Sequence, residues 1–344
     1  MLRQVHFNQG HLLGQVGGEG AEQATLDALL ASIVYSSAIE GEKLNAFSVR
    51  SSLANKLGIS EERQYPVTAQ TDGLAEMTVD AINNWESTLT LERILTWHAL
   101  LFPEGYTLLN PIQGGVLRGD EPMQVVSGQL DRPKVHFEAP SRNVLEQELN
   151  QFIDWFNTSK SDKALDPVVR AAITHLWFVT LHPLDDGNGR ITRLLADLAL
   201  AQGENQSVRF YAMSVSILER RKSYYAILES TQKGGLNITA WVLWFLDTLN
   251  DALLNTLGTI EQTLSKTNYW RRVDQTQLTT EQVKVLNRLL DGEFELGINS
   301  SQYQKVTKVS RATATRHLSQ LVKVGCLVKT DAGGRSTRYV VSQT

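Results

Sequence analysis

Residues 182–190 gather side chains that act on phosphate groups. They read His-Pro-Leu-Asp-Asp-Gly-Asn-Gly-Arg in one uninterrupted run. Glycines let a backbone approach a ligand closely, and the free N–H groups at the start of a helix attract anions. Gly187, Asn188 and Gly189 are therefore expected to form a cradle for a phosphate.

Charged and titratable residues flank this cradle. Arg190 and Arg193 lie three positions apart, so both can bind phosphate oxygens, and two arginines indicate more than one phosphate. Asp186 can hold Mg²⁺, which favours one or two carboxylates together with substrate phosphates. His182 has an ordinary pKa near neutrality and can take a proton as a general base. ATP with Mg²⁺ meets all of these demands.

The alternative is purely structural: a polar helix N-terminus beside a core histidine whose hydrogen bonds are satisfied. This alternative would explain a glycine-rich loop that stood alone. The joint pattern of histidine, acid, glycines and two arginines favours phosphate chemistry instead. No Gly-Lys-Ser/Thr follows the glycines, so the loop is not of the Walker type.

Two helices are expected to position the loop. Asp166 can cap a helix whose first residue is Pro167, and apolar residues at helical spacing carry that helix to about Leu181. A second apolar period runs over residues 191–199. Further helices are expected over residues 21–38, 91–101, 144–156, 214–231 and 238–264, which predicts a mainly α fold.

Two stretches depart from the helical period. Residues 124–137 hold two β-prone runs around a Gly and Pro turn, which predicts a hairpin. Residues 267–277 are polar and poorly periodic, which predicts a linker to a C-terminal module.

Composition limits the class of protein. From Asn299 onward eight basic residues face one acid, a net charge of +7, which leaves −11 on the rest of a chain of −4. Cys326 is the only cysteine, so we expect a buried thiol and no internal disulfide. The N-terminus lacks a signal-peptide pattern and no apolar run spans a membrane, so a cytoplasmic protein with no membrane contact is expected.

The loop resembles the signature of the Fic family, His-x-Phe-x-Asp/Glu-Gly-Asn-Gly-Arg-x-x-Arg, with Leu184 in place of the phenylalanine. The resemblance implies a Fic-type helical bundle that transfers AMP from ATP to a Ser, Thr or Tyr hydroxyl of a target protein, or of itself, and releases pyrophosphate. His182 would be the base, Asp186 would hold Mg²⁺, and the loop amides with Asn188 and both arginines would bind phosphates. Gly189 stands where the kinase-like branch of the family carries lysine.

The same resemblance assigns two further parts of the site. The hairpin looks like the family's flap, which aligns a target segment by strand addition, with contacts expected from Val125, Val126, Ser127, Gly128 and Val135. An adenine and ribose pocket is expected from Tyr224, Tyr225 and Gln232. Ordinary helix packing is the alternative for one of the two tyrosines, because adjacent helical residues cannot face one pocket equally.

An inhibitory motif is expected near the N-terminus, where Ser36, Glu40 and Gly41 match the family pattern Ser/Thr-x-x-x-Glu-Gly/Asn. Glu40 is expected to pair with Arg193 and to slow transfer by displacing the terminal phosphate. The alternative is an ordinary helix end at Gly41.

The C-terminal module resembles a winged helix-turn-helix. Helices are expected over residues 281–290, 301–306 and after Ser310, and strands over 327–329 and 337–341. Possible DNA contacts are Arg311, Thr313, Arg316 and Arg335, and protein contact is the alternative.

Three domains follow: residues 1–90 with the inhibitory motif, 91–265 as the catalytic core and 278–344 as the winged helix. The non-enzyme alternative is a nucleotide-sensing, DNA-binding transcription regulator with little or no turnover. His182 favours the enzyme, because a sensor has no use for a general base. The oligomeric state stays open, with a homodimer as one option.

Overall fold

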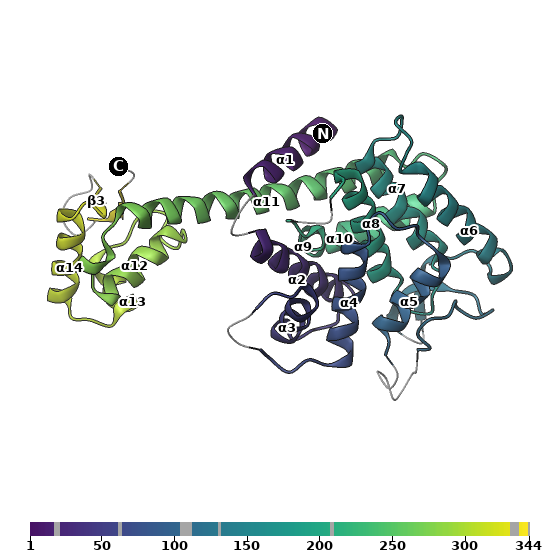
Figure 1. The fold of residues 1–344 in the computed structure, drawn as a ribbon, viewed down its shortest axis with the longest axis horizontal. Helices are drawn as coiled ribbons and strands as arrows, with labels where there is room; N and C mark the ends of the chain where they lie inside the picture. Colours follow the sequence, from purple (N-terminus) through teal and green to yellow (C-terminus); the bar gives the residue numbers. More distant parts are fainter. Residues whose placement is uncertain are drawn as a thin grey trace. The chain divides into compact units, whose positions relative to one another are not determined.

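The protein is mainly helical and divides into two compact units, Met1–Thr256 and Leu257–Thr344. The structure, a computed structural model, describes residues 1–16, 21–60, 64–103, 112–129, 132–206, 210–330 and 337–342. Figure 1 shows the helices and strands of both units, and each unit has its own core and is described by itself. Among the described residues, no helix has both the length and the apolar character needed to cross a membrane.

The first unit consists of helices and one hairpin. Its elements are α1 (Leu2–Gln15), α2 (Ala21–Ile39), α3 (Ala46–Leu57), α4 (Ala69–Asn83), α5 (Leu91–Leu101), β1 (Gln124–Gln129), β2 (Arg132–Glu138), α6 (Arg142–Ser159), α7 (Pro167–Leu181), α8 (Asn188–Glu204), α9 (Met213–Glu219), α10 (Arg221–Gln232) and the first part of α11 (Thr239–Arg272).

The helix pair α7 and α8 forms the centre of this unit and makes the most extensive contact between any two of its elements. The Asp166 carboxylate caps α7 by accepting the N–H groups of Val168 and Val169 at 2.9 and 3.3 Å, as the sequence predicts. Phe178 of α7 and Leu195 of α8 are fully buried. Burial of each such side chain contributes about 1.5–3 kcal/mol, so the short segment between the two helices starts and ends on rigid elements.

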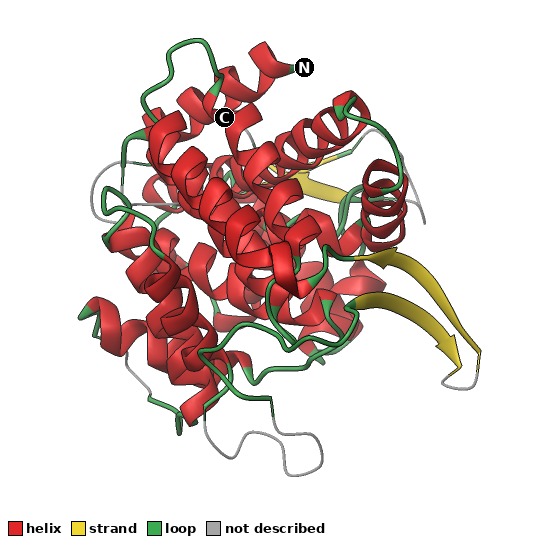
Figure 2. Cartoon of the chain, turned by 90° about the vertical axis from the view of Figure 1, so that its right-hand side faces the viewer, coloured by secondary structure: helices red, strands yellow, loops and turns green. Residues whose placement is uncertain are grey.

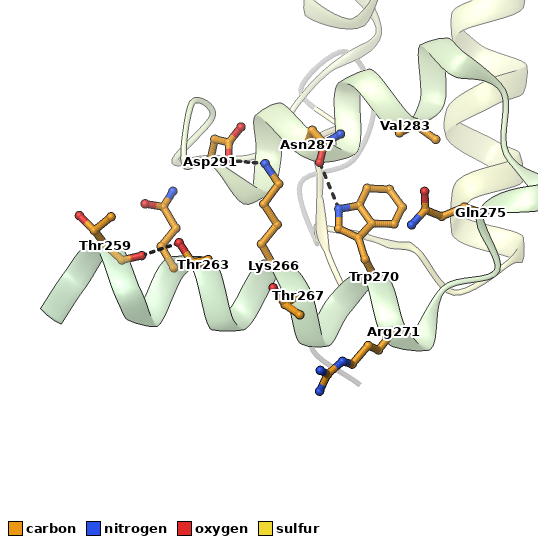
Figure 3. A pocket seen from close by; sticks show the side chains of 11 residues that line it. Thr259, Thr263, Lys266, Thr267, Trp270, Arg271, Gln275, Val283, Asn287 and Asp291 are labelled. Carbon is orange, nitrogen blue, oxygen red and sulfur yellow. Dashed lines mark hydrogen bonds and ion pairs between the residues drawn. The ribbon is translucent and has the colours of Figure 1, made fainter. Parts of the chain in front are cut away.

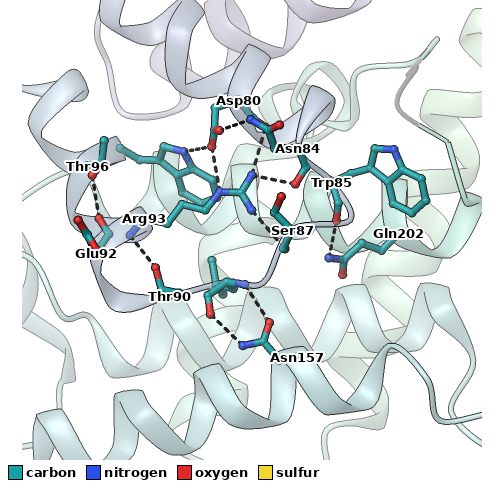
Figure 4. A network of polar contacts seen from close by, with 12 residues as sticks. Asp80, Asn84, Trp85, Ser87, Thr90, Glu92, Arg93, Thr96, Asn157 and Gln202 are labelled. Atoms are coloured by element: carbon teal, nitrogen blue, oxygen red, sulfur yellow. Dashed lines mark hydrogen bonds and ion pairs between the residues drawn. The ribbon is translucent and has the colours of Figure 1, made fainter.

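A partly exposed polar network fastens α4 to α5 (Figure 4). The Asp80 carboxylate accepts hydrogen bonds from Arg93 Nε at 2.9 Å, from Trp97 Nε1 at 2.8 Å and from Asn84 Nδ2 at 2.7 Å. The Arg93 guanidinium also lies over the Trp97 ring, 5.0 Å from its centroid. The end of α4 and the start of α5 are thereby held together by a charge that is paired and fully hydrogen-bonded.

The single helix expected over residues 214–231 is wrong, because the structure has two helices there, α9 and α10. The chain breaks at Arg220, between α9 and α10. The Arg220 guanidinium binds two carboxylates of α11, Asp247 and Asp251. This anchoring fixes the position at which α10 starts, whereas the apolar spacing continues through the break.

The hairpin of β1 and β2 is confirmed, and it extends away from the helical body in Figure 2. Val126 pairs with Val135, Ser127 with Lys134 and Gly128 with Pro133, and the register shifts between Val125 and Val126. The base of the hairpin is closed by the Ala139 N–H, which donates to Met123 O at 2.9 Å.

The second unit contains the end of α11, the short helix η1 (Gln275–Gln277), α12 (Thr280–Leu290), α13 (Ser300–Thr307), α14 (Arg311–Lys323), β3 (Leu327–Lys329) and β4 (Tyr339–Val341). Ser310 caps α14 by accepting the Thr313 N–H at 3.2 Å, and β3 pairs with β4 antiparallel. This order of helices and strands is the one expected for a winged helix-turn-helix.

The linker expected over residues 267–277 is wrong in its first half. The helix α11 continues to Arg272, because Tyr269 and Trp270 pack into the core of the second unit. The Tyr269 hydroxyl donates to the carbonyl of Cys326 at 3.0 Å, and the Cys326 thiol is buried as expected. The packing of these two adjacent aromatic residues therefore extends α11 through a polar stretch whose sequence does not predict a helix.

Candidate active site

The loop between α7 and α8 brings the expected catalytic residues together. α7 ends at Leu181, and His182 adopts a left-handed conformation with φ of 47°. Its N–H donates to Phe178 O at 3.1 Å, which closes the helix end. Such a conformation is uncommon for residues other than glycine and is kept only where the surroundings determine it.

The His182 ring has one nitrogen committed and one available. Nδ1 lies 3.1 Å from the carbonyl oxygen of Val179, which can only accept, so Nδ1 carries the proton and Nε2 is the basic atom. Burial lowers the pKa of His182, and the Arg118 charge adds to that effect against the opposing influence of Glu40 and Asp186. The ring is therefore neutral around pH 7, as a general base must be.

The side chain of Asn188 bonds to the backbone of its own loop and does not point to a ligand. Its side chain accepts the Leu184 N–H at 3.0 Å and donates to Leu184 O at 2.7 Å, so the amide pins the loop. Its expected role as a phosphate ligand is thus left to its backbone. Leu184 is fully buried, so leucine fills the position of the family's phenylalanine.

Gly187 and Asp186 form the turn into α8. Gly187 has φ of 80°, and a Cβ there would come within 2.5 Å of the Leu101 side chain, so only glycine fits. The half-exposed Asp186 carboxylate accepts the Gly187 N–H at 2.5 Å. Its exposure leaves it accessible to a cation.

The two arginines are buried and keep donors free for an anion. Arg190 and Arg193 are 6% and 3% exposed. Within the described part of the chain, Arg190 Nε and Arg193 Nη1 are buried and have no hydrogen-bond partner. A buried, unpaired guanidinium donor costs about 1–3 kcal/mol or more, and an anion in the cradle would remove that cost.

The N-terminal motif reaches this loop. Arg193 Nη2 donates to Glu40 Oε1 at 2.8 Å and to Ser36 O at 2.9 Å, and Arg193 Nε donates to Ser36 Oγ at 2.8 Å. The pair of Glu40 and Arg193 is thus present. Gly41, with φ of 87°, also lies just past the end of α2, so the helix-end interpretation holds as well.

Glu40 is charged in this position. Burial raises the pKa of its carboxyl, but the charge and hydrogen bond of Arg193, together with Arg190 and Tyr225, outweigh burial and leave the pKa below its ordinary value. At Gly189, an added Cβ would lie 2.1 Å from Glu40 Oε1. The Glu40 carboxylate therefore fills the space beside the cradle.

Glu42 is a second acid at the site that the sequence motif does not include. Its Oε2 lies 2.6 Å from Arg190 Nη1, and its carboxylate also accepts from Gln70. The sequence holds one signal for it, because Glu42 is a second acid only two residues after Glu40. Each arginine of the loop thus has its own carboxylate on the segment after α2.

The two adjacent tyrosines differ, as expected for neighbours on a helix. Tyr225 is 38% exposed, and its hydroxyl lies 3.3 Å from both Glu40 Oε2 and Ile39 O, so it faces the site. Tyr224 is buried, and its hydroxyl lies 2.9 Å from His175 Nε2. Burial, with the Arg193 charge, lowers the pKa of His175 to about 3, so this histidine is a neutral core residue. Gln232 Nε2 donates to Thr180 Oγ1 at 3.2 Å and connects α10 to α7.

The hairpin carries exposed apolar side chains at the middle of its length. Val126 and Val135 are 50% and 40% exposed. The side chain of Ser127 lies outside the described part of the structure, and for Gly128 only the backbone pairing is given. His136 Nδ1 lies 2.6 Å from Glu229 Oε2 of α10, so β2 is fastened to the helix that bears Tyr225.

The second unit presents basic residues on α14. Arg311 and Arg316 are exposed, and Thr313 is partly exposed and interacts with the capping Ser310. Arg335 lies outside the described residues. The unit also has an open hollow of about 860 Å³ between the end of α11 and α12, beside Trp270 and Lys266 (Figure 3). Of the expected site residues that the structure describes, none lines this hollow.

Two family profiles match the chain, and both matches lie within the first unit. A family profile described as "Domain of unknown function (DUF4172)" matches residues 1–59, and that of the Fic/DOC family matches residues 88–200. The chain is 26% identical over 239 residues to the protein adenylyltransferase fic-1 of Caenorhabditis briggsae, covering 69% of this chain and 43% of the relative. It is 25% identical over 218 residues to the protein adenylyltransferase Fic of Nematostella vectensis, covering 62% and 46%. The chain thus spans less than half the length of these curated relatives.

Solved structures share the fold. A Fic family protein from Desulfovibrio desulfuricans G20 aligns over 99% of this chain and 95% of its own, with a TM-score of 0.55 and 20% identity. Fic-1 of Caenorhabditis elegans aligns over 76% of this chain and 72% of its own, with a TM-score of 0.53 and 21% identity.

Proposed function

The chain carries a Fic/DOC family domain, and on that premise we propose that it transfers AMP from ATP to a Ser, Thr or Tyr hydroxyl of a target protein. One observation carries the proposal: the loop that bears a neutral histidine with its Nδ1 already bonded also bears Arg190 and Arg193, whose buried Nε and Nη1 have no partner among the described residues. An anion site beside a base is the arrangement that nucleotidyl transfer requires.

Each residue then has a part in the reaction. The free N–H groups at the start of α8 and the two guanidinium groups bind the phosphates of ATP, and Tyr225 and Gln232 border the nucleotide. His182 Nε2 takes the proton of the target hydroxyl as its oxygen attacks the α-phosphorus. The bond to pyrophosphate breaks, and pyrophosphate leaves. Asp186 fits Mg²⁺, which would neutralise phosphate charge when bound.

The segment after α2 restrains this reaction. Glu40 on Arg193 and Glu42 on Arg190 occupy the guanidinium groups that would hold the terminal phosphates. ATP can then bind only in an unproductive arrangement. Glu40→Gly is expected to raise transfer roughly tenfold or more, which corresponds to a coupling of about 1–3 kcal/mol.

Radiolabelled ATP tests the proposal directly. Purified Glu40→Gly protein should incorporate label from the α-phosphate of ATP, into itself or into a lysate protein, and none from the γ-phosphate. His182→Ala in the same background should lower incorporation by about 10²- to 10⁴-fold, while the exposed histidine variant His11→Ala serves as the matched control. Label from the γ-phosphate would make the protein a kinase and would overturn the assignment.

For the second unit we propose DNA binding, because Arg311, Arg316 and Lys323 are all exposed on α14. Fluorescence anisotropy of a labelled duplex with the full chain should show binding that weakens as salt rises. Arg311→Ala with Arg316→Ala should reduce it, whereas Arg288→Ala on α12 should not. Absence of binding at low salt would favour protein contact instead.

A further inference from the structure

Arg118 is a buried arginine that joins the catalytic loop to the base of the hairpin. Its side chain is 2% exposed. Nε donates to the carbonyl oxygen of His182 at 2.9 Å, and Nη2 donates to the carbonyl oxygen of Pro140. The backbone N–H of Arg118 donates to Pro183 O at 3.0 Å. One residue therefore holds His182 and its successor through both side chain and backbone.

The other end of this bridge belongs to the hairpin. Pro140 follows Ala139, whose N–H closes the base of the hairpin against Met123. The carbonyl of Arg118 in turn accepts Arg142 Nε, at the start of α6, at 3.1 Å. The backbone around Arg118 is thus fixed to α6, and its guanidinium spans from the hairpin base to the loop.

A guanidinium is needed for this bridge. A buried charge is costly unless it is well hydrogen-bonded, and among the described residues the Arg118 side chain bonds only to carbonyl groups. The planar fork of arginine can reach two carbonyls at once, whereas the ammonium of lysine is a single point. Both hydrogen bonds thus use the geometry of the guanidinium, and the charge of Asp185 acts on it in addition.

We propose that Arg118 is a positioning residue, which sets the general base His182 at a fixed distance from the hairpin that presents the target hydroxyl. The inference rests on the proposed AMP transfer. Arg118 does not contact the phosphate cradle, so its loss leaves nucleotide binding intact and misplaces the base relative to the hydroxyl. A misplacement of about 1 Å costs roughly 10²-fold in rate.

The chain offers a matched control in Arg170. This arginine is equally buried, and it donates to Ser159 Oγ at 2.9 Å, to Phe156 O at 2.6 Å and to Gln202 Oε1 at 2.9 Å, away from the loop. Arg170→Lys therefore reports the general effect of losing a buried guanidinium fork. Arg118→Lys reports that effect together with the loss of the bridge.

The test places Arg118→Lys and Arg170→Lys separately in full-length Glu40→Gly protein. We expect Arg118→Lys to lower the rate of auto-modification at saturating ATP by roughly 10²-fold, with affinity for α,β-methylene-ATP within about twofold of the parent. Arg170→Lys should keep the parent rate even where its melting temperature falls as far. An unchanged rate in Arg118→Lys, or equal rate losses in the two variants, would overturn the inference.

Hydrogen exchange separates this inference from the proposed function. In Arg118→Lys, peptides covering the hairpin base and residues 182–187 should both exchange faster, and in Arg170→Lys neither should. If the parent transfers no AMP while this exchange pattern appears, the proposed function fails and the bridge stands. If transfer occurs but Arg118→Lys does not speed exchange in both segments together, Arg118 is not the bridge.

Discussion

At the scale of single residues, the role proposed for His182 depends on its surroundings. Its carbonyl is held by Arg118, its Nδ1 by Val179, and its pKa is lowered mainly by burial. The neutral, basic form of the His182 ring thus persists to a lower pH than in a free histidine.

The pH dependence of transfer follows from this lowered pKa. We expect the transfer rate of Glu40→Gly protein to stay constant as pH falls through the ordinary histidine value of 6.5 and to decline only below it, where His182 becomes protonated. Removal of Glu40 takes away a charge that raises this pKa, so the variant keeps the low midpoint. A rate profile with its midpoint at or above 6.5 would contradict the assignment of His182 as a buried base.

Glu42 gives a second prediction about restraint. Adding Glu42→Gln to Glu40→Gly should increase transfer by a further factor of about five, because Arg190 is released as well. Glu76→Gln, which removes an exposed acid paired with Lys56, is the control for loss of charge and should change nothing. Equal rates in the double and single variants would limit the brake to Glu40.

The residues with a chemical signature were predictable, and those that act through geometry were not. The spacing of His182, Asp186, Arg190 and Arg193 identifies the loop, and the Fic motif identifies Glu40. Arg118 and the loop-closing side chain of Asn188 carry no such signature, because their partners are backbone carbonyls distant in sequence or within the loop itself.

At the scale of elements, the junction of α4 and α5 depends on the charge of Asp80. Burial raises the pKa of this carboxyl, but its hydrogen bonds from Asn84, Arg93 and Trp97, with the Arg93 charge, leave the pKa lowered. A lowered pKa in the folded state adds stability that is present above the ordinary pKa and is lost as pH falls through the lowered value.

Asp80→Asn is therefore expected to reduce the free energy of unfolding by about 1–3 kcal/mol near neutral pH. Urea unfolding should show this difference shrinking as the pH falls through the lowered pKa of Asp80. The substitution of Asn84 by Ala removes one bond without removing the charge and should cost less. A difference that stays constant with pH would mean that Asp80 is not ionised in the network.

Helices with a strong apolar period were predictable to within a few residues, as α5, α7 and α14 illustrate. α1, α3 and α4 were not predicted, because small and polar residues interrupt their apolar stripes. Serines, for example, occupy buried positions of α3, and Asn8 and Gln9 occupy buried positions of α1. The break at Arg220 depends on carboxylates more than 25 residues away, which no local period records.

At the scale of the whole molecule, the two units have separate cores. Leu318 is fully buried in the core of the second unit, together with Leu286, Tyr303 and Leu321. The expected boundary at residues 265–278 remains a prediction, and the unit division lies within α11.

Separate cores predict separable stability. Leu318→Ala should destabilise the second unit by about 2–5 kcal/mol and lower one transition in calorimetry, while AMP transfer below that transition is unchanged. The matched variant in the first unit, Leu195→Ala, should lower the other transition and reduce transfer. A single transition that shifts as a whole in both variants would show that the units unfold together.

Because Glu40 Oε1 lies so close to position 189, substitutions at codon 40 and at codon 189 would both remove the Glu40 carboxylate from its place beside the cradle. A genetic selection can tell the two kinds of substitution apart. A methyl group at 189 would expel the same carboxylate that Glu40→Gly deletes, yet it would also narrow the cradle. Alleles that relieve the brake should therefore accumulate at codon 40. Substitutions at codon 189 should appear among intragenic suppressors that silence an overactive Glu40→Gly allele.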